Sequence, residues 1–544
     1  MEIPNSNSLE LLADLAADLR AAAYTLEGVE QFLGASAWAA LNRDQLIPAL
    51  LVSEQHDADP LSVIVQLWLL ARPQSEERIN NAFPTLAAAG LAELGLVEVS
   101  GASENGPLIS ALVDLRPYGW DANADGSGGA ELWVASDLGA HQRPGVLRKD
   151  HVLGIGQAST TLVQMTARRH VARALDLGTG CGVQTFHLLH HAEHVTATDI
   201  SKRALAFTRF NILLNAAALE VNPEALEERV SLRLGSLLEP VEGECFDLVV
   251  SNPPFVITPR VAGESTDEQF TYRDGGLPGD DIVSQLVTSL PSILNPGGTA
   301  QMLGNWEVVE GATWDQRPRT WIPENTDAWF IQREQIGPEQ YAETWLQDAS
   351  EGRDPRLYAQ AYNAYLQDFR SRNVEAIGFG MIWLRRPMQE PAYTGERSDG
   401  GTSPQRRIFR FEEITYPIEQ PTGPHIGAAV ERADWLAART LGNEYLVVAE
   451  DVTEERHQRP GAEHPGVILL RQGAGLRRTN LLSTELAGLV SASDGELTVG
   501  QLVEALASLL GGDEDFDRDA FTRNLLQETA NLLVDGFLIP AETE

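Results

Sequence analysis

Two segments in the middle of the chain carry residues whose types and spacing can bind a nucleoside. In LDLGTGCGVQT, Asp176 ends a strand-like run, and Gly178, Gly180 and Gly182 follow in the turn that opens a predicted helix. Glycines let the main chain approach a ligand closely, and the first turn of a helix presents N–H groups without partners. In TATDIS, Asp199 follows 23 residues after Asp176, at the end of the next predicted strand. A carboxylate at that place can accept hydrogen bonds from both hydroxyls of a ribose.

The glycine-rich turn by itself is compatible with two alternative roles. It could serve a dinucleotide, although its spacing is GxGxG instead of GxGxxG, or it could only allow a strand and a helix to pack tightly. The acidic residue at the end of the following strand makes simple packing the weaker alternative. The two segments therefore favour a nucleoside-containing cofactor.

A third segment, SNPPF, follows the predicted strand FDLVVS. DLGTGCG, TATDIS and SNPPF occur in this order on successive strands, and together they resemble class I S-adenosylmethionine-dependent methyltransferases with an Asn-Pro-Pro-aromatic motif. Within that class, the chain is similar to the small-domain N-methyltransferases. These include HemK-type protein glutamine methyltransferases and ribosomal RNA guanine amino-group methyltransferases. The resemblance covers residues 145–305 well and extends to residue 415; it implies S-adenosyl-L-methionine as the cofactor.

The resemblance also implies a role for each residue of the cofactor site. Asp176 and the glycines would line the methionine end of the cofactor, Asp199 would hold the ribose, and Ile200 would pack on the adenine. The chain departs from the family after the third strand, where glycine and serine stand in place of an acidic residue that usually lies near the adenine. Two further contacts fall in the upstream segment DHVLGIGQAST. The complete expected set is Asp176, Gly178, Gly180, Gly182, Asp199, Ile200, Gly235, Ser236, Gln157 and Ser159.

Asn252 is the residue that we expect to carry the reaction. An amide or base amino nitrogen is a poor nucleophile because its lone pair is delocalised. The side-chain oxygen of Asn252 and the carbonyl of Pro253 can accept its two N–H bonds, and the fixed φ angles of the prolines hold these acceptors in place. Phe255 offers a planar substrate a face for stacking. An isolated Asn-Pro-Pro would be no more than a strand stop, but its place after a cofactor-type turn favours catalysis. The expected catalytic set is Asn252, Pro253, Pro254 and Phe255.

The elements that must position these residues alternate between strand and helix. Short runs rich in β-branched residues are separated by helical patterns such as CGVQTFHLLHHA, which is typical of a doubly wound α/β sheet with parallel strands. The resemblance implies a seven-stranded, Rossmann-like methyltransferase sheet. The strand-like runs are RALDL, HVTATDI, RVSLRL, FDLVVS and GGTAQMLGNW, with VEAIGFGMIWLRRP and RIFRFEEI as a closing pair.

The sheet is predicted to lie between two smaller helical domains. Residues 1–117 show helical periodicity followed by two alternating runs, which favours a winged-helix-like domain. Residues 118–439 form the methyltransferase domain, with an aromatic-rich insertion at 306–373 that contains two helical runs. Residues 440–544 are predicted to form a second small winged-helix-like domain.

The composition limits the possible partners and surroundings. Of 544 residues, 43% are hydrophobic and 22% are charged, and no apolar run is long enough to span a membrane. Two cysteines, Cys181 and Cys245, exclude a disulfide framework, and the acidic start lacks the features of a secretory signal, so we expect a cytoplasmic protein. The net charge of −38 repels phosphate, so any nucleic-acid contact would need a local basic patch.

Three further groups of side chains receive less weight. The histidines of HLLHHAEH have helical i,i+4 spacing but no acidic or cysteine partner at a recognisable spacing, so we expect an ordinary helix surface and no metal. Seven arginines could form an RNA-facing patch, although solvated arginines are the default. Four tryptophans of the insertion could frame a substrate mouth or fill core. These arginines and tryptophans are Arg385, Arg386, Arg406, Arg407, Arg471, Arg477 and Arg478, and Trp306, Trp314, Trp321 and Trp329.

The sequence leaves the substrate open between macromolecules. A base amino group of ribosomal or transfer RNA fits Phe255 as a stacking platform and the flanking domains as docking modules, and we lean towards it. A protein glutamine fits the segment YRDGGLPGDDI, which resembles the Gly-Gly-x-x-Gly segment of HemK-type enzymes, and it suits an acidic enzyme better. A third hypothesis is a non-catalytic regulator that binds the cofactor. The oligomeric state cannot be predicted.

Overall fold

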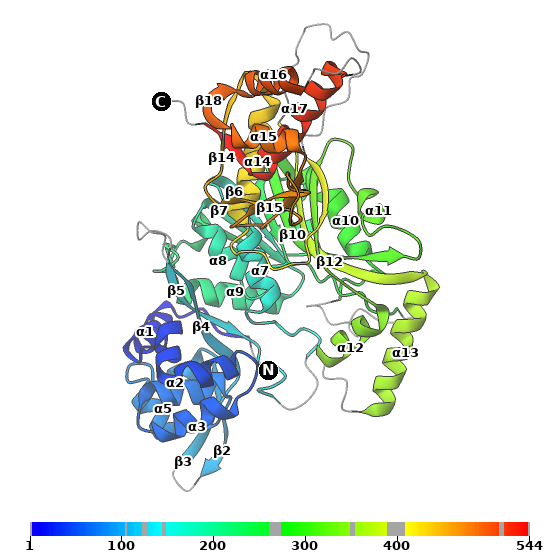
Figure 1. Cartoon of the computed structure of the whole chain (residues 1–544). Coiled ribbons are helices and arrows are strands. Elements are labelled where there is room, and N and C mark those ends of the chain that lie inside the picture. Colours follow the sequence, from blue (N-terminus) through cyan, green and yellow to red (C-terminus); the bar gives the residue numbers. More distant parts are fainter. Residues whose placement is uncertain are drawn as a thin grey trace. The chain divides into compact units, whose positions relative to one another are not determined.

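A computed structural model describes most of the chain in two compact units (Figure 1). The first unit comprises Met1–Val163, His170–Thr326 and Glu334–Glu390, and the second comprises Gln164–Arg169, Asp327–Arg333 and Pro391–Glu544. The described residues are 3–103, 106–121, 129–143, 148–260, 274–348, 354–388, 408–510 and 516–541.

The first unit contains the predicted α/β sheet, so the Rossmann-like fold class is confirmed. Its strands follow the order β12-β10-β9-β6-β7-β8, and all neighbours are parallel except β10 and β12, which are antiparallel. The strands are β6 (Val171–Leu177), β7 (Ala192–Asp199), β8 (Val230–Leu234), β9 (Phe246–Ser251), β10 (Leu294–Val309) and β12 (Val374–Arg385). The helices of this region are α7 (Gln157–Met165), α8 (Val183–Leu189), α9 (Lys202–Leu214), α10 (Asp281–Ser289), α11 (Gln316–Arg319), α12 (Pro338–Asp348) and α13 (Pro355–Ser371).

The central strands form because their side chains can be buried on both faces. Ala174 and Leu175 of β6 and Leu248 and Val249 of β9 are fully buried, as is usual for the middle of a parallel sheet covered by helices. The helices start at local signals, since the hydroxyl of Ser201 accepts a hydrogen bond from the third N–H of α9. These signals place the strand ends, and with them the candidate site.

The expected insertion needs correction, and the expected count of seven strands is not confirmed. In the described residues, six strands of the sheet belong to the first unit, whereas β13 (Phe409–Glu413) and most of β11 (Asp327–Ile336) belong to the second. β10 runs on to Val309, and β11 lies inside the range 306–373, where the sequence predicts an insertion; β11 pairs in parallel with β13. The first six residues of β11 are all buried, so the run DAWFIQ lacks the alternation that reveals a half-exposed strand. The two predicted helical runs of this range are confirmed as α12 and α13.

The N-terminal part of the first unit is helical and ends in two small antiparallel sheets, one ordered β1-β3-β2 and one made of β4 and β5. The second of the two alternating runs predicted at the end of residues 1–117, LISALVDLRPYG, is divided between β3 and β4. A winged-helix-like character of residues 1–117 stays a prediction. The elements are α1 (Leu9–Ala21), α2 (Leu26–Leu41), α3 (Ile47–Gln55), α4 (Pro60–Ile64), β1 (Gln74–Ser75), α5 (Glu76–Ala82), α6 (Ala87–Glu93), β2 (Val97–Ser103), β3 (Gly106–Ala111), β4 (Asp114–Trp120) and β5 (Ala130–Ser136).

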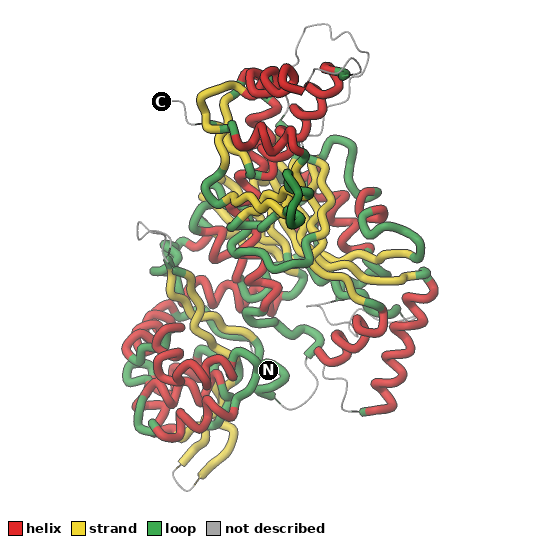
Figure 2. Tube along the Cα trace, in the orientation of Figure 1, coloured by secondary structure: helices red, strands yellow, loops and turns green. Residues whose placement is uncertain are grey.

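In its described residues, the second unit contains the helices α14 to α17 and two three-stranded antiparallel sheets (Figure 2). Their apolar side chains share a core. The sheets are ordered β18-β14-β19 and β15-β16-β17. None of the helices in the described parts of either unit is long and apolar enough to cross a bilayer. The elements are α14 (Gly423–Ala437), β14 (Tyr445–Val448), β15 (Val452–His457), β16 (Val467–Gln472), β17 (Thr479–Leu482), α15 (Thr484–Ser491), β18 (Asp494–Thr498), α16 (Val499–Leu510), α17 (Arg518–Asp535) and β19 (Leu538–Pro540).

Candidate active site

The strand register brings the three predicted segments to one edge of the sheet. Leu177 of β6 is opposite Thr198 of β7 on one side and opposite Ser251 of β9 on the other. The hydroxyl of Ser251 donates a hydrogen bond to the carbonyl of Leu177 at 2.8 Å. The glycine turn, the end of β7 and the SNPPF segment therefore begin side by side at the carboxyl ends of neighbouring strands, where ligands bind in open α/β sheets.

The glycine turn presents open space at two of its three glycines. Gly178 has φ 79° and Gly180 has φ 58°, and no heavy atom lies within 4 Å of the position that a Cβ would take. At Gly182, in contrast, a Cβ would lie 3.1 Å from the ring of Phe186. Gly178 and Gly180 thus leave room for a ligand beside the main chain, whereas Gly182 allows α8 to pack closely.

Asp176 is fully buried and keeps one oxygen atom without a donor. Its Oδ2 atom accepts hydrogen bonds from the hydroxyls of Thr179 at 2.8 Å and Thr185 at 2.7 Å. Its Oδ1 atom has no hydrogen-bond partner among the described residues. Burial raises the pKa of Asp176 to about 6, and the two threonine hydroxyls oppose this rise. A buried acceptor without a donor suits the amino group of a bound ligand.

Asp199 ends β7 with both oxygens oriented by main-chain N–H groups. Oδ1 accepts from Ser201 at 2.8 Å and Oδ2 accepts from Gly180 at 3.0 Å. Each carboxylate oxygen can accept a second bond, so the pair of ribose hydroxyls expected from the sequence fits these atoms. Burial raises the pKa of Asp199 above its ordinary value. The neighbouring Ile200 is 59% exposed, which is unusual for its size and leaves an apolar surface for a planar ring.

The end of β8 adds an apolar residue that the sequence analysis missed. Leu234 is opposite Asp199 in the register and is 46% exposed. Gly235 follows, and its N–H donates to the carbonyl of Asp199 at 3.1 Å; Ser236 is exposed. The only sequence signal for Leu234 was its place as the last residue of a predicted strand.

The upstream segment reaches α8 through its main chain. Gln157 is exposed and begins α7. The carbonyl of Ser159 accepts a hydrogen bond of 2.9 Å from the side-chain amide of Gln184 in α8. The structure thus links residue 159 to the first turn of the helix that follows the glycine turn.

The Asn-Pro-Pro-Phe segment leaves β9 with its amide oxygen buried and unpaired. Asn252 is half-buried, and its Oδ1 atom has no donor in the described part of the chain. Pro253 is buried, while Pro254 and Phe255 are partly exposed. A Cβ at Gly275 would lie 2.9 Å from the carbonyl of Pro254, so the residue at position 275 must be small. An unpaired acceptor thus stands beside the open glycine turn.

The segment is fastened a few residues further on by groups that no sequence pattern distinguishes. The N–H of Ile257 donates to the hydroxyl of Tyr341 at 2.8 Å, and the side-chain amide of Asn305 donates to the same hydroxyl at 3.0 Å. Asp274 accepts from Thr258 at 2.8 Å and forms an ion pair with Arg260. Tyr341 lies within a helical aromatic pattern that predicts only burial.

The GGLPGDDI segment leads into α10 but does not cap this helix through the side chain of Asp280. Asp280 precedes α10, but its side chain makes no capping hydrogen bond. Its carboxylate instead accepts the N–H of Glu307 at 2.8 Å and pairs with the guanidinium of Arg317 at 2.6 Å. The fully buried carboxylate of Asp280 is thus bound by Arg317 and by the main chain of β10, and not by the N–H groups of α10.

The histidines are not an ordinary helix surface. α8 ends at Leu189, so His194 lies in β7, and the i,i+4 pair of His190 and His194 does not exist. His187 is buried, and its Nε2 atom lies 2.7 Å from the hydroxyl of Tyr118. Within the ranges that the structure describes, no three His, Cys, Asp or Glu side chains are grouped so that they could hold a metal ion.

Most of the described arginines of the predicted RNA-facing patch are buried or paired with carboxylates. Arg385 is buried, and Arg471 and Arg478 each pair with a glutamate carboxylate, at 2.6 and 2.8 Å. Arg406 and Arg407 lie outside the described residues. These side chains give little support to an RNA-facing patch.

Three of the four tryptophans fill the core. Trp306, Trp321 and Trp329 are buried, and Trp314 stacks on Trp306 with ring centroids 5.7 Å apart. The interpretation as core is therefore confirmed for the three buried residues, and a mouth framed by them is wrong.

Comparisons with known proteins show similarity to methyltransferases. Residues 138–271 match the family described as "Methyltransferase small domain", and residues 21–106 match a domain of unknown function, DUF7059. The chain is 32% identical over 184 residues to a ribosomal protein uL3 glutamine methyltransferase of Bradyrhizobium diazoefficiens, covering 33% of this chain and 54% of that protein. It is 31% identical over 159 residues to a release factor glutamine methyltransferase of Geobacter sulfurreducens, covering 28% and 53%. The resemblance to class I methyltransferases is thereby confirmed.

The chain spans about half the length of the curated relatives it matches. Among solved structures, it is similar to a SAM-dependent methyltransferase of Thiobacillus denitrificans in complex with S-adenosyl-L-homocysteine, at 17% identity and TM-score 0.23, covering 43% of this chain and 92% of that one. A 16S rRNA N2 methyltransferase of T. Thermophilus is 19% identical with TM-score 0.21, covering 43% and 55%. Similarities at this level say nothing about the reaction or the substrate.

Proposed function

We propose that this protein is an S-adenosylmethionine-dependent N-methyltransferase that acts on a planar amide or amino nitrogen of a macromolecule. The observation that carries the proposal is the buried, unpaired Oδ1 atom of Asn252, on the strand next to a glycine turn that leaves open space. A buried acceptor without a donor costs free energy, about 1–3 kcal/mol, which a substrate N–H can recover. The family match over residues 138–271 supports the same reaction class.

The residues present fit the cofactor. Asp176 offers a buried acceptor for its amino group, and Gly178 and Gly180 leave the space that a Cβ would fill. Asp199 has spare acceptor capacity for the ribose hydroxyls. The exposed apolar side chains of Ile200 and Leu234 stand at the ends of neighbouring strands, where they can contact the adenine. The cofactor supplies an electrophilic methyl group on a sulfonium.

The chain's own contribution to the reaction is orientation. Asn252 Oδ1 and the carbonyl of Pro253 accept the two N–H groups of the substrate, so the nitrogen lone pair is directed towards the methyl group. The prolines fix φ, and the acceptors need no reorganisation during the reaction. No general base is required, because the proton on nitrogen becomes acidic only as the N–C bond forms and then passes to water. Phe255 contributes a partly exposed aromatic face for the planar group.

A protein glutamine is the substrate that the observations favour. The two curated relatives compared above are named as glutamine methyltransferases of a ribosomal protein and a release factor. The net charge of −38 disfavours a phosphate backbone, and most of the described candidate arginines are buried or paired. An RNA base, which the sequence alone favours slightly, is the second candidate because Phe255 can stack on it. We also propose a cytoplasmic location, which is compatible with either substrate.

Label transfer distinguishes these substrates. The protein is incubated with tritiated S-adenosylmethionine and an extract of cells that lack it. Label in protease-sensitive, RNase-resistant material supports a protein substrate, and the reverse pattern supports RNA. No transfer, despite cofactor binding, would favour the regulator hypothesis instead.

Substitution of Asn252 tests the residue itself. Asn252→Ala is expected to lower the rate about 10²- to 10³-fold, as for removal of other preorganised polar groups, while cofactor affinity stays within about twofold. Asn222→Ala, which changes an exposed asparagine, is the matched control and should leave both unchanged. Equal loss of cofactor binding in Asn252→Ala would contradict the assigned role.

A further inference from the structure

One of the contacts that anchor the segment containing Asn252 is a buried hydrogen bond beyond Phe255. The N–H of Ile257, five residues after Asn252, donates to the hydroxyl of Tyr341 at 2.8 Å. Both Ile257 and Tyr341 are fully buried. Because water cannot replace a lost partner there, this bond defines where the main chain runs after the two prolines.

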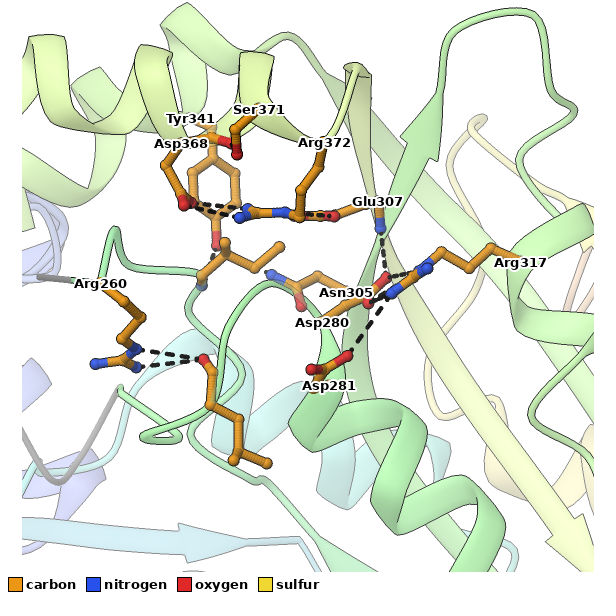
Figure 3. Close-up of polar contacts among 12 residues, drawn as sticks. Arg260, Asp280, Asp281, Asn305, Glu307, Arg317, Tyr341, Asp368, Ser371 and Arg372 are labelled. Atoms are coloured by element: carbon orange, nitrogen blue, oxygen red, sulfur yellow. Dashed lines mark hydrogen bonds and ion pairs between the residues drawn. The ribbon is translucent and has the colours of Figure 1, made fainter. Parts of the chain in front are cut away.

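Asn305 holds the tyrosine hydroxyl in turn. Its side-chain Nδ2 atom donates to the Tyr341 hydroxyl at 3.0 Å, and Figure 3 shows the two side chains directed towards each other. Asn305 is fully buried in β10, and its Oδ1 atom has no donor among the described residues. If the amide is turned over, the tyrosine O–H donates to it instead, so in both orientations the pair fixes the hydroxyl.

The helix α12, which carries Tyr341, and its neighbour α13 do not depend on this hydroxyl for their attachment. Arg372, which follows α13, forms ion pairs of 2.7 Å with Glu307 of β10 and with Asp368 (Figure 3). Tyr341 also packs in a buried apolar cluster that includes Phe369, with the ring centroids 5.5 Å apart. Removing the hydroxyl oxygen would therefore free the N–H of Ile257 without undocking the helices.

We propose that Tyr341, held by Asn305, is a positioning residue for the acceptors of the Asn-Pro-Pro-Phe segment. This inference rests on the proposed methyltransferase function and adds to it a residue 89 positions after Asn252. Two acceptors must stay aligned with one nitrogen, and a displacement of about 1 Å can cost roughly 10²-fold in rate. The prolines stiffen the segment, and Tyr341 sets where the stiff segment ends.

Tyr341→Phe is the test, with Tyr362→Phe as the matched control. The Tyr362 hydroxyl also belongs to this helix pair but bonds to Glu343 in an exposed contact of 3.1 Å. We expect Tyr341→Phe to lower the initial rate of label transfer from saturating tritiated S-adenosylmethionine about 10- to 100-fold. The KM and calorimetric Kd for S-adenosylmethionine should stay within about twofold. Tyr362→Phe should leave all three values unchanged.

Hydrogen exchange provides a readout that does not depend on turnover. In Tyr341→Phe, the amide of Ile257 should exchange faster, whereas amides of α8 should exchange as in the wild type. Asn305→Ala keeps the Tyr341 hydroxyl but removes the side-chain amide that donates to it, so it should give a smaller change in rate and in hydrogen exchange. If Tyr341→Phe does not fold, Asn305→Ala tests the positioning role in its place.

The outcomes separate this inference from the function on which it rests. Wild-type protein without methyl transfer would overturn the function. An active wild type together with an unchanged rate in Tyr341→Phe would overturn only the positioning role. A Tyr341→Phe protein that unfolds more readily but turns over at the wild-type rate per folded molecule would also overturn it.

Discussion

The candidate site has a cofactor half, which contains Asp176 and Asp199, and an acceptor half, which is the segment that begins at Asn252. The contacts that hold the two halves differ greatly in sequence separation. The carboxylates of Asp176 and Asp199 accept hydrogen bonds from residues at most 19 positions away. The segment after Asn252 depends on Ile257 and Tyr341, which are 84 positions apart. One half is therefore built from a motif and its neighbours, and the other from a loop and a distant helix. The two halves should fail differently when they are mutated.

The largest effect is expected from Gly180→Val in the cofactor half. A β-branched side chain at φ 58° strains the main chain by about 1–3 kcal/mol and fills open space beside the turn. The Kd for S-adenosylmethionine should rise at least about 100-fold by calorimetry, which corresponds to about 2.7 kcal/mol. Hydrogen exchange of residues 252–258 should not change.

Gly311→Val is the control for Gly180→Val. Gly311 has φ 76° and the same open surroundings, but it lies in the turn after β10. It should carry the same backbone strain and keep cofactor affinity. Equal losses of affinity in both variants would show that strain, and not the filled space, explains the result.

The difference in range also explains which parts of the site were predictable. The glycine turn, Asp199 and Asn252 could be placed at one edge of the sheet from sequence, because each lies at or directly after the end of a strand and the carboxyl ends of parallel strands meet at one edge. Tyr341 and Asn305 could not be selected, because nothing local distinguishes a buried tyrosine that accepts an N–H from one that only packs.

The same limit applies to the fold. The strands β6 to β10 were predicted from β-branched runs between helical patterns. β11 was missed because it is buried on both faces and shows no alternation, so its aromatic residues were assigned to an insertion. The carboxylate of Asp280, just before α10, pairs with Arg317, 37 positions away. Local patterns could not reveal these distant partners.

A smaller effect is expected from Asp176→Asn, which keeps the shape of the side chain but removes its charge. Loss of a charged acceptor should weaken S-adenosylmethionine binding about 10- to 30-fold, which corresponds to about 1.4–2 kcal/mol and is typical of a hydrogen bond to a charged group. The rate at saturating cofactor should hardly change, because the acceptor half is untouched. An unchanged Kd would show that Oδ1 does not face the ligand.

The ligand-free Asp176→Asn variant should be more stable at pH 7. The folded-state pKa of about 6 is above the ordinary 3.8, so the folded state binds this proton more tightly than the unfolded state. Protonated Asp176 therefore stabilises the folded wild type at low pH, and this contribution to the free energy of unfolding is lost as the pH rises through 6. Removing the charge should raise the free energy of unfolding by about 1–3 kcal/mol at pH 7 and by little at pH 4. Urea unfolding at both pH values measures this.

The pH dependence of the Kd for S-adenosylmethionine should also reveal the titration of Asp176. As the pH falls below about 6, Asp176 takes up a proton and the wild-type Kd for S-adenosylmethionine should rise by up to tenfold per pH unit. Asp199, whose pKa is also raised by burial, changes the Kd in the same direction. Asp176→Asn should show a flatter profile. Identical profiles for both proteins would assign the titration to another group.

The smallest effect is expected where the cofactor half has a contact of intermediate range. Gln184 and Ser159 are 25 positions apart, and their bond uses the main-chain carbonyl of Ser159. Gln184→Leu should loosen α7 and raise the Kd for S-adenosylmethionine about two- to fivefold, as expected for one neutral hydrogen bond of about 0.5–1 kcal/mol. Ser159→Ala keeps the carbonyl and should change the Kd less than twofold. If Ser159→Ala has the larger effect, its hydroxyl contacts the cofactor directly, and even this longer contact was then predictable from the motif.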